Sequence, residues 1–304
     1  MNIKGIIYTI CSAMLFGITP LLARIVYSYG ASSITVVFFR SLLVLPILWL
    51  LAKRQGISLR IERYELKNLA LIALFGSGLT NILLFTSYEY IDVGTATTLH
   101  FLYPVAVSIL CMVMYRDVLP KVKLISLGIA MIGTFCFFMN SSGGNILGYL
   151  FAMASAITYA FYMVQMEKTR LAHRNAYLIS FYIAMFVVVE TLALHLITPS
   201  ITIQIPLQGY GILLLLGIVS SFLAVVLLQY GIALLGSSTA SLFCLFEPIT
   251  SVLCGALFLS ESITLWKLAG CIIIFSALII MTIAEKKQHS KMLPIKEEID
   301  NKSE

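Results

Sequence analysis

The feature that most constrains this chain is a series of long apolar stretches, which follow one another with only short polar segments between them. A helix needs about 20 mainly apolar residues to cross a lipid bilayer, because the hydrocarbon layer is about 30 Å thick. Hydrophobic residues make up 60% of the 304 residues and charged residues 11%, whereas soluble domains carry about 25% charged residues. We therefore expect an all-α integral membrane protein in a lipid bilayer. Ten transmembrane helices are predicted, at about residues 4–24, 33–52, 69–90, 94–115, 122–139, 147–165, 177–197, 209–230, 237–259 and 264–284.

The basic residues are unevenly distributed among the segments that join these helices. With ten spans both ends of the chain lie on one side, and 17 of the 20 Lys and Arg residues fall on that side. Because basic loops are retained in the cytoplasm, we expect a multi-pass protein of the cell membrane with both termini cytoplasmic. Residues 285–304 are polar and are predicted to form a disordered cytoplasmic tail. The net charge of +6 is spread over short loops and this tail, so nucleic-acid binding is not expected.

Sequence motifs for ATP hydrolysis, catalysis and metal binding are absent. No phosphate-binding loop of the form G-x-x-x-x-G-K-[ST] occurs, so ATP-driven work by this chain alone is not expected. The six cysteines all lie within apolar stretches and are interpreted as packing residues, without a disulfide framework. The four histidines are too dispersed for a metal site. We therefore expect no cofactor, no metal and no enzymatic activity.

The chain also matches itself weakly when it is shifted by 143–144 residues. Each half then contains five predicted spans, an odd number, so the halves cross the membrane in opposite orientations. Basic residues surround Asp117 but not its counterpart Glu261, as expected for opposite sides of a membrane. This predicts two inverted repeats, residues 4–139 and 147–284, with a binding site near the midplane between them. The matched residues include Thr95-Ala96 with Thr239-Ala240, Pro104 with Pro248, and Asp117 with Glu261.

Several of these features together resemble the drug/metabolite transporter superfamily, and within it the EamA-type transporters. They are the repeat itself, the Phe39-Arg40 pair, the Thr-Ala and Pro pattern, and the acidic residue after the fourth and ninth spans. The resemblance covers residues 4–284 and implies a secondary exporter of amino acids, other metabolites or drugs, without naming a substrate. The family's usual Gly-Glu after the fourth span is Arg116-Asp117 here, and Ser260-Glu261 in the second half. We expect that departure to affect loop packing more than transport.

Ionisable residues inside the spans identify candidate functional positions. A charged residue at the centre of a membrane helix costs about 2.5–3.5 kcal/mol on insertion scales, so such residues usually face a cavity or a partner. Six residues meet this description: Arg40, Glu89, His100, Glu190, His195 and Glu247.

Glu247 lies about ten residues into its span, about 15 Å deep at 1.5 Å per residue, which is near the midplane. The following Pro248 removes a backbone donor and is predicted to kink the helix. One interpretation makes Glu247 a binding site for a substrate amine, a proton carrier, or both. The other makes it a protonated carboxyl group that bonds to a neighbouring helix and stabilises the kink.

The repeat pairs Tyr103-Pro104 with Glu247-Pro248, so Pro104 is predicted to form a structural kink in the first half. His100 lies one turn before Tyr103 on the same helix face. Tyr103 is a candidate for covering an apolar or aromatic substrate. His100 is a candidate for titration near neutral pH, or else a packing residue held by a hydrogen bond.

Arg40 needs a partner within the membrane, and Glu89 is the obvious candidate. The pair is interpreted as an outer gate or as a static structural ion pair, with Arg40 alternatively binding a substrate carboxylate. Glu190 is a further candidate for substrate binding or coupling, and His195 is close enough to the end of its span to reach the interface. Polar and aromatic residues that are candidates for lining a cavity are Tyr8, Phe16, Asn81, Tyr88, Tyr159, Tyr162, Tyr182 and Gln229.

Three function classes remain at this point. A secondary transporter of a small molecule, coupled to protons or to a substrate gradient, fits the repeat and the midplane residues best. A membrane-embedded enzyme would cluster its polar residues near one interface, and these residues are instead spread across the outer half and the midplane. A channel or a non-transporting membrane subunit is the alternative, and substrate identity, direction and oligomeric state are not predicted.

Overall fold

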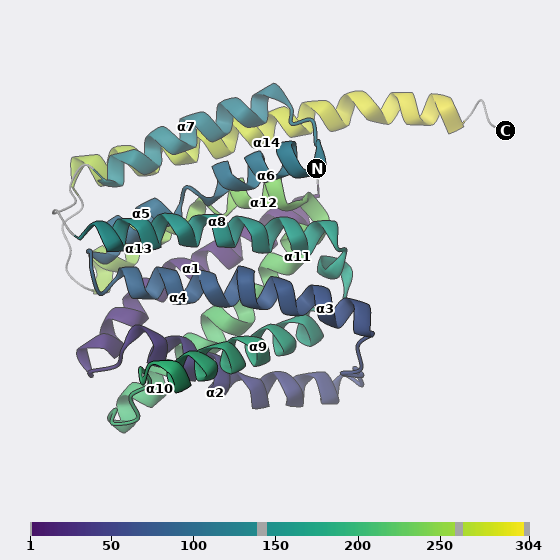
Figure 1. Cartoon of the computed structure of the whole chain (residues 1–304). Helices are drawn as coiled ribbons and strands as arrows, with labels where there is room; N and C mark the ends of the chain where they lie inside the picture. Colours follow the sequence, from purple (N-terminus) through teal and green to yellow (C-terminus); the bar gives the residue numbers. More distant parts are fainter. Residues whose placement is uncertain (1, 139–144, 259–263, 301–304) are drawn as a thin grey trace.

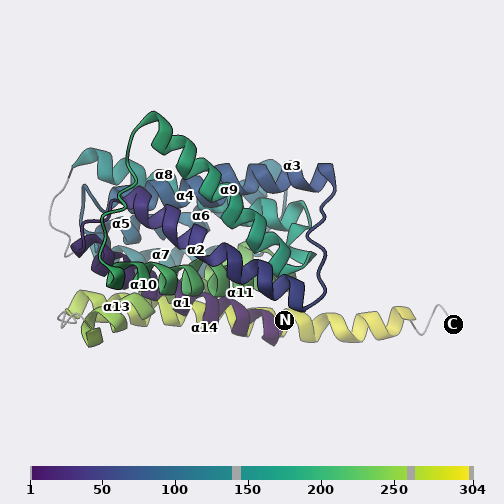
Figure 2. The same ribbon diagram turned by 90° about the horizontal axis from the view of Figure 1, so that it is seen from below.

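Every element that the computed structural model describes is helical (Figure 1). The described backbone comprises residues 2–138, 145–258 and 264–300, and side chains are described outside 137–138 and 284–300. Figures 1 and 2 show helices running alongside one another, with both ends of the chain at the same end of the bundle. Within this part, nine helical segments are long and apolar enough to cross a bilayer. The chain is therefore an all-α, multi-pass membrane protein.

The fifth and tenth expected spans correspond to α7 (Lys121–Phe138) and α14 (Leu265–Asp300). α7 is not among the nine segments, and the expected end of its span, residue 139, lies outside the described residues, so the count of ten stays a prediction. α14 runs on to Asp300, so most of the segment predicted to be disordered, 285–304, is helical here. Its many Lys and Glu residues are good helix formers, and they continue a helix that the apolar residues before them have already begun.

Besides α7 and α14, four long helices are uninterrupted: α1 (Ile3–Ser28), α2 (Ser33–Arg54), α8 (Ile146–Lys168) and α9 (Ala176–Ile197). Side-chain caps begin each of them, since Asn2, Ser32, Asn145 and Asn175 accept hydrogen bonds from backbone N–H groups of the first turn. These four helices are the first, second, sixth and seventh expected spans.

The third and eighth spans share a π-helical segment near their middle. In the third, η1 (Ile72–Gly78) joins α3 (Arg63–Leu71) to α4 (Leu79–Ser87). In the eighth, η3 (Gly217–Ala224) joins α10 (Leu207–Leu216) to α11 (Val225–Leu235). A π turn fits an extra residue into the helix and often marks a functional site. The same irregularity therefore occurs at equivalent places in the two halves.

The fourth and ninth spans are both broken shortly before a proline, two residues before Pro104 and three residues before Pro248. α5 (Val93–His100) and α6 (Tyr103–Tyr115) flank the first break, and α12 (Ser237–Phe243) and α13 (Phe246–Phe258) flank the second. Proline has no N–H group and its ring clashes with the preceding turn, so the helix stops and restarts. The backbone hydrogen bonds match as well, because Leu102 bonds to Leu99 and Leu245 bonds to Leu242, each at 3.1 Å.

Helix packing follows the same division into halves. α1, from the first half, packs against the eighth and ninth spans, while α8, from the second half, packs against the third and fourth. α2 packs against its counterpart α9, and α7 against its counterpart α14, a pair that lies along one edge of the bundle in Figure 1. The molecule is thus a two-repeat fold in which each half completes the other.

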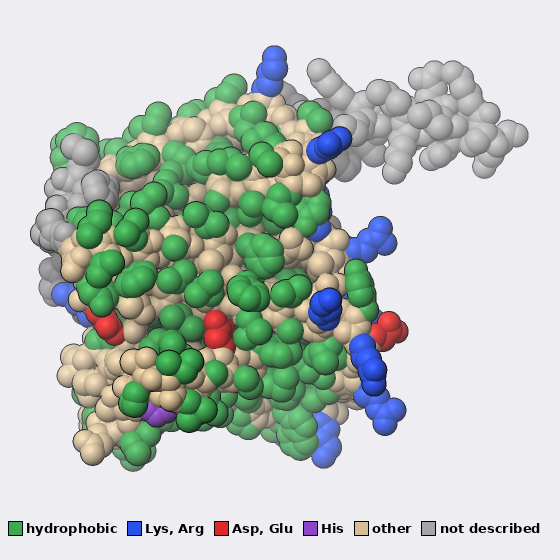
Figure 3. Space-filling view, in the orientation of Figure 1, with side chains coloured by type: hydrophobic (Ala, Val, Ile, Leu, Met, Phe, Trp, Pro, Cys, Tyr) green, Lys and Arg blue, Asp and Glu red, His purple; other side chains and the backbone are tan. Residues whose placement is uncertain are grey.

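Polar contacts join the halves at both ends of the bundle. At the end that carries most of the visible Lys and Arg side chains in Figure 3, Lys168 Nζ lies 2.5 Å from Asp117 Oδ2, and Glu167 accepts a 2.7 Å bond from Ser237 N–H. At the other end, Ser32 donates to the Ser200 carbonyl at 2.5 Å and Thr202 N–H donates to Thr35 at 2.8 Å. Hydrogen bonds therefore connect the two halves at both ends in this conformation.

Candidate functional site: a cavity between the two halves

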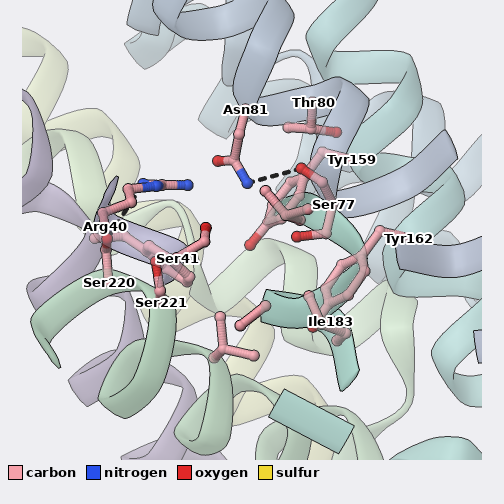
Figure 4. A pocket seen from close by; sticks show the side chains of 14 residues that line it. Arg40, Ser41, Ser77, Thr80, Asn81, Tyr159, Tyr162, Ile183, Ser220 and Ser221 are labelled. Carbon is pink, nitrogen blue, oxygen red and sulfur yellow. Dashed lines mark hydrogen bonds between the residues drawn. The ribbon is translucent and has the colours of Figure 1, made fainter. Parts of the chain in front are cut away.

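A small cavity lies where the uninterrupted helices meet the two π-helical segments (Figure 4). Its volume is about 50 Å³, far below the roughly 300–1,000 Å³ of pockets that hold drug-sized ligands. A metabolite therefore enters only if the bundle opens. The lining residues come from both halves: Phe16, Arg40, Ser41, Ser77, Thr80, Asn81, Tyr159, Tyr162, Ile183, Ala184, Val187, Ser220, Ser221 and Val225.

Most lining residues form pairs related by the 143–144-residue offset. Each member of a pair occupies the equivalent helix of its own half, so the cavity lies between the repeats rather than within one of them. The pairs are Phe16 and Tyr159, Arg40 and Ile183, Ser41 and Ala184, Ser77 and Ser220, and Asn81 and Val225.

Arg40 supplies a charge to this cavity. Its side chain is only 5% exposed, it donates a 3.2 Å hydrogen bond to Ser220, and its guanidinium carbon lies 4.8 Å from the centre of the Phe85 ring. Figure 4 shows the guanidinium extending from α2 into the space in front of Asn81. A cation over an aromatic face is stabilised, which offsets part of the cost of burying Arg40.

The expected ion pair between Arg40 and Glu89 is not present in this structure. Glu89 instead accepts a 2.9 Å hydrogen bond from the backbone N–H of Ser33, in the first turn of α2. A carboxylate at this position is stabilised by the unpaired N–H groups of a helix N-terminus. Tyr27 lies within electrostatic range of both side chains. Glu89 thus contributes to capping α2 rather than to the charge of the cavity.

Three other predicted residues lie together around the breaks in the fourth and ninth spans. The His100 ring lies 5.3 Å from the Tyr103 ring and also 5.3 Å from Tyr159, and its Nδ1 atom lies 2.9 Å from Ser155 Oγ. The rings of Tyr103 and Tyr159 meet edge to face at 4.8 Å. Glu247 is within electrostatic range of both tyrosines. Since Tyr159 also lines the cavity, it links this aromatic cluster to the cavity.

The carboxyl group of Glu247 has no hydrogen bond or ion pair with any residue that the structure describes, although its backbone N–H donates to the Cys244 carbonyl at 2.9 Å. Its helix is held close to α1 through Gly17, where an added Cβ atom would lie 2.8 Å from the Glu247 carbonyl oxygen. The alternative interpretation required a hydrogen bond from its carboxyl group to a neighbouring helix. Such a bond is absent from the described part of the chain, and the partly buried carboxyl group stays available to a ligand or a proton.

Glu190 lies apart from the other predicted residues, against the first π-helical segment. An added Cβ atom on Gly78, in η1, would lie 1.8 Å from Glu190 Oε2, so only glycine leaves room for this carboxylate. Oε2 is buried without a hydrogen-bond partner among the described residues. Glu190 is one turn beyond Val187, which lines the cavity.

Sequence reasoning missed the serines of the cavity. Ser77 in η1 and Ser220 in η3 are a repeat-related pair of polar residues, and that pairing was the available signal. Two cavity candidates have structural roles instead: Gln229 donates to backbone carbonyls of residues 171–174, the nearest at 2.9 Å, and Tyr182 donates to the Leu59 carbonyl at 2.8 Å. In the described part of the chain, no three His, Cys, Asp or Glu side chains are grouped for a metal ion.

Two matched helical halves around a shared cavity are the architecture expected of a membrane transporter. The sequence profile of the EamA-like transporter family matches residues 3–139 and again 146–283, so the chain belongs to this family.

Similar proteins agree with this assignment. An uncharacterized transporter of Synechocystis sp. is 27% identical over 91% of this chain and 92% of its own length. The uncharacterized transporter YcbK of Bacillus subtilis is 25% identical over 88% of this chain and 89% of its own. A crystal structure with 13% sequence identity covers 95% of this chain and 99% of its own with a TM-score of 0.77, which is a likeness of fold alone.

Proposed function

We propose that this protein is a secondary, ATP-independent exporter of amino acids or related small metabolites or drugs, which works by alternating access. The observation that supports it is the cavity lined by repeat-related residues of both halves. A site on the boundary between two similar units is exposed to one side or the other when the units rock. The hydrogen bonds at both ends of the bundle would then break and form in turn.

We further propose ten spans arranged as inverted repeats, with both termini in the cytoplasm of the cell. The packing supports the repeats, because exchanging the two halves reproduces the main helix neighbours: α1 packs against α11 and α13, and its counterpart α8 packs against α4 and α6. The charge supports the orientation, because 17 of the 20 basic residues belong to segments that the ten-span order assigns to the same side as the termini. Cysteines introduced into the loops, labelled from outside intact cells, test this arrangement.

Glu247 is proposed to couple transport, by carrying a proton or by binding a substrate amine. The sequence predicts its depth to be near the midplane, its charge is within electrostatic range of Tyr103 and Tyr159, and its carboxyl group lacks a partner among the described residues. An ionised carboxylate is costly there, so gaining a proton or a cationic group changes the energy of the site. His100, Tyr103 and Glu190 are the supporting residues proposed for binding or coupling.

The test is flux of labelled solutes into proteoliposomes without ATP, including counterflow. Glu247→Gln is expected to reduce flux at least about tenfold, the equivalent of 1.4 kcal/mol, and to flatten its dependence on pH. The matched control is Glu62→Gln. Glu62 lies just before α3, and its side chain makes no capping hydrogen bond there. Wild-type rate and pH dependence in Glu247→Gln would rule out the coupling role. Flux that does not saturate and shows no counterflow would instead identify a channel, and no flux of any solute would favour a non-transporting subunit.

A further inference from the structure

The cavity holds a positive charge that none of its lining residues balances. Arg40 stays protonated in proteins at all ordinary pH values. Its hydrogen-bond partner Ser220 is neutral, its Nε atom is buried without a partner, and no Asp or Glu lines the cavity. A buried charge of this kind is expensive unless an opposite charge reaches it. The described conformation therefore contains an anion site without a protein carboxylate to fill it.

Two further donors face the same space. The hydroxyl groups of Tyr162 and Ser221 are both buried without a hydrogen-bond partner in the described part of the chain, and both residues line the cavity. A carboxylate accepts hydrogen bonds on two oxygens, and it matches the planar fork of a guanidinium group. The three orphaned donors together have the chemistry of a carboxylate-binding site.

The second half supplies a different surface at the equivalent positions. Ile183 stands where the first half has Arg40, and Ala184 stands where it has Ser41. Val187 continues this apolar strip along α9, and Ile183 and Val187 are 5% and 2% exposed. The cavity is thus charged on one side and apolar on the other, although the helices around it are arranged alike.

We propose that this cavity binds a small organic monoanion, with its carboxylate on Arg40, Tyr162 and Ser221 and its apolar remainder against Ile183, Ala184 and Val187. That this anion is the transported substrate rests on the proposed function. The present volume of about 50 Å³ accommodates little more than the carboxylate group, so the apolar remainder requires the halves to separate. Because such a ligand contacts both halves, its binding would favour the conformation in which the halves are separated.

Thermal unfolding of the purified full-length protein in detergent tests the binding directly. 4-Methylvalerate is expected to raise the unfolding temperature, whereas its uncharged isostere 4-methylvaleramide is not. Arg40→Gln should weaken the affinity for 4-methylvalerate about 10- to 100-fold, the range expected for hydrogen bonds to a charged group. Arg40→Lys keeps the charge but loses the fork, and an intermediate loss is expected. Ile183→Ala should shift preference toward carboxylates with a larger apolar part.

The matched control is Lys53→Gln, which makes the same change of charge on the same helix outside the cavity, and it should bind like the wild type. If Arg40→Gln fails to fold, Tyr162→Phe and Ser221→Ala each remove one donor and should each weaken binding. Equal stabilisation by the amide, tighter binding of inorganic phosphate, or undiminished binding by the Arg40 or donor variants would overturn the proposal. Transport of a solute without a carboxylate, at wild-type rate in Arg40→Gln, would overturn this inference and leave the transport function intact.

Discussion

Gly217→Ala is expected to wedge apart the two backbones that hold Arg40 in place. Gly217, in η3, packs directly on α2, and an added Cβ atom would lie 2.4 Å from the carbonyl oxygen of Arg40. Ordinary contact begins near 3.4 Å, so the backbones must separate by 3.4 − 2.4 = 1.0 Å. The three atoms nearest to this Cβ are all backbone atoms of Arg40, which cannot rotate away as a side chain does. The strain therefore falls on the helix packing itself.

Gly211→Ala is the matched control, because Gly211 lies six residues earlier in the same span and an added Cβ atom meets nothing within 4 Å. Both substitutions gain the helix preference of alanine over glycine, so this gain cancels in the comparison. Overpacking a tight contact costs about 1–3 kcal/mol, and we expect Gly217→Ala to be less stable than Gly211→Ala by that amount. Equilibrium unfolding in mixed micelles measures the difference. If the two variants agree within about 0.5 kcal/mol, the close contact between η3 and α2 does not determine the packing.

Three further effects follow from local geometry. The coupling energy of the Lys168–Asp117 pair, measured by a double-mutant cycle, should be only about 0.2–1 kcal/mol, because the side chains are 22% and 34% exposed. A larger coupling energy would contradict this expectation. His195→Ala should lower the free energy of unfolding by about 1–2 kcal/mol and speed hydrogen exchange in residues 198–206, because His195 Nδ1 accepts hydrogen bonds from the N–H groups of Ser200 and Ile201. Unchanged exchange in these residues would refute this role of His195. Gly236→Ala should lose about 1–3 kcal/mol of unfolding free energy, since φ 78° and ψ 159° suit only glycine, and wild-type stability would show that the turn adapts.

Hydropathy predicted where the chain crosses the membrane because the energy of burying a helix in lipid depends mainly on its length and composition. The irregularities at residues 101–102 and 244–245 were predictable in part, because Pro104 and Pro248 each remove a backbone donor and favour a kink. That they become full breaks was not, since Pro20 and Pro46 leave α1 and α2 continuous. The π-helical segments could not be predicted from the sequence, because no hydrophobic period distinguishes a π turn from an α turn within a wholly apolar stretch.

Side-chain partners were harder to predict than positions along the chain. Hydropathy gives the depth of Arg40 and Glu89, but it does not give the direction in which each side chain leaves its helix. The ion pair was therefore predicted from opposite charge alone. In the structure Arg40 contacts Ser220 and the Phe85 ring, and Glu89 accepts a hydrogen bond from a backbone N–H group. Aromatic rings and helix ends also stabilise buried charges in part, and a sequence does not show which of these contacts a given side chain makes.

The repeated π turns carry information about the order of events in the history of the fold. If the two halves arose by duplication of one segment, the widened turn shared by η1 and η3 was present before the copy was made. Paired copies of that ancestral segment would have enclosed a symmetric cavity, with a serine from each copy at the positions of Ser77 and Ser220. The difference between Arg40 and Ile183 then arose after the duplication. In that case the helix arrangement is older than the ligand preference, which arose from later substitutions in one half.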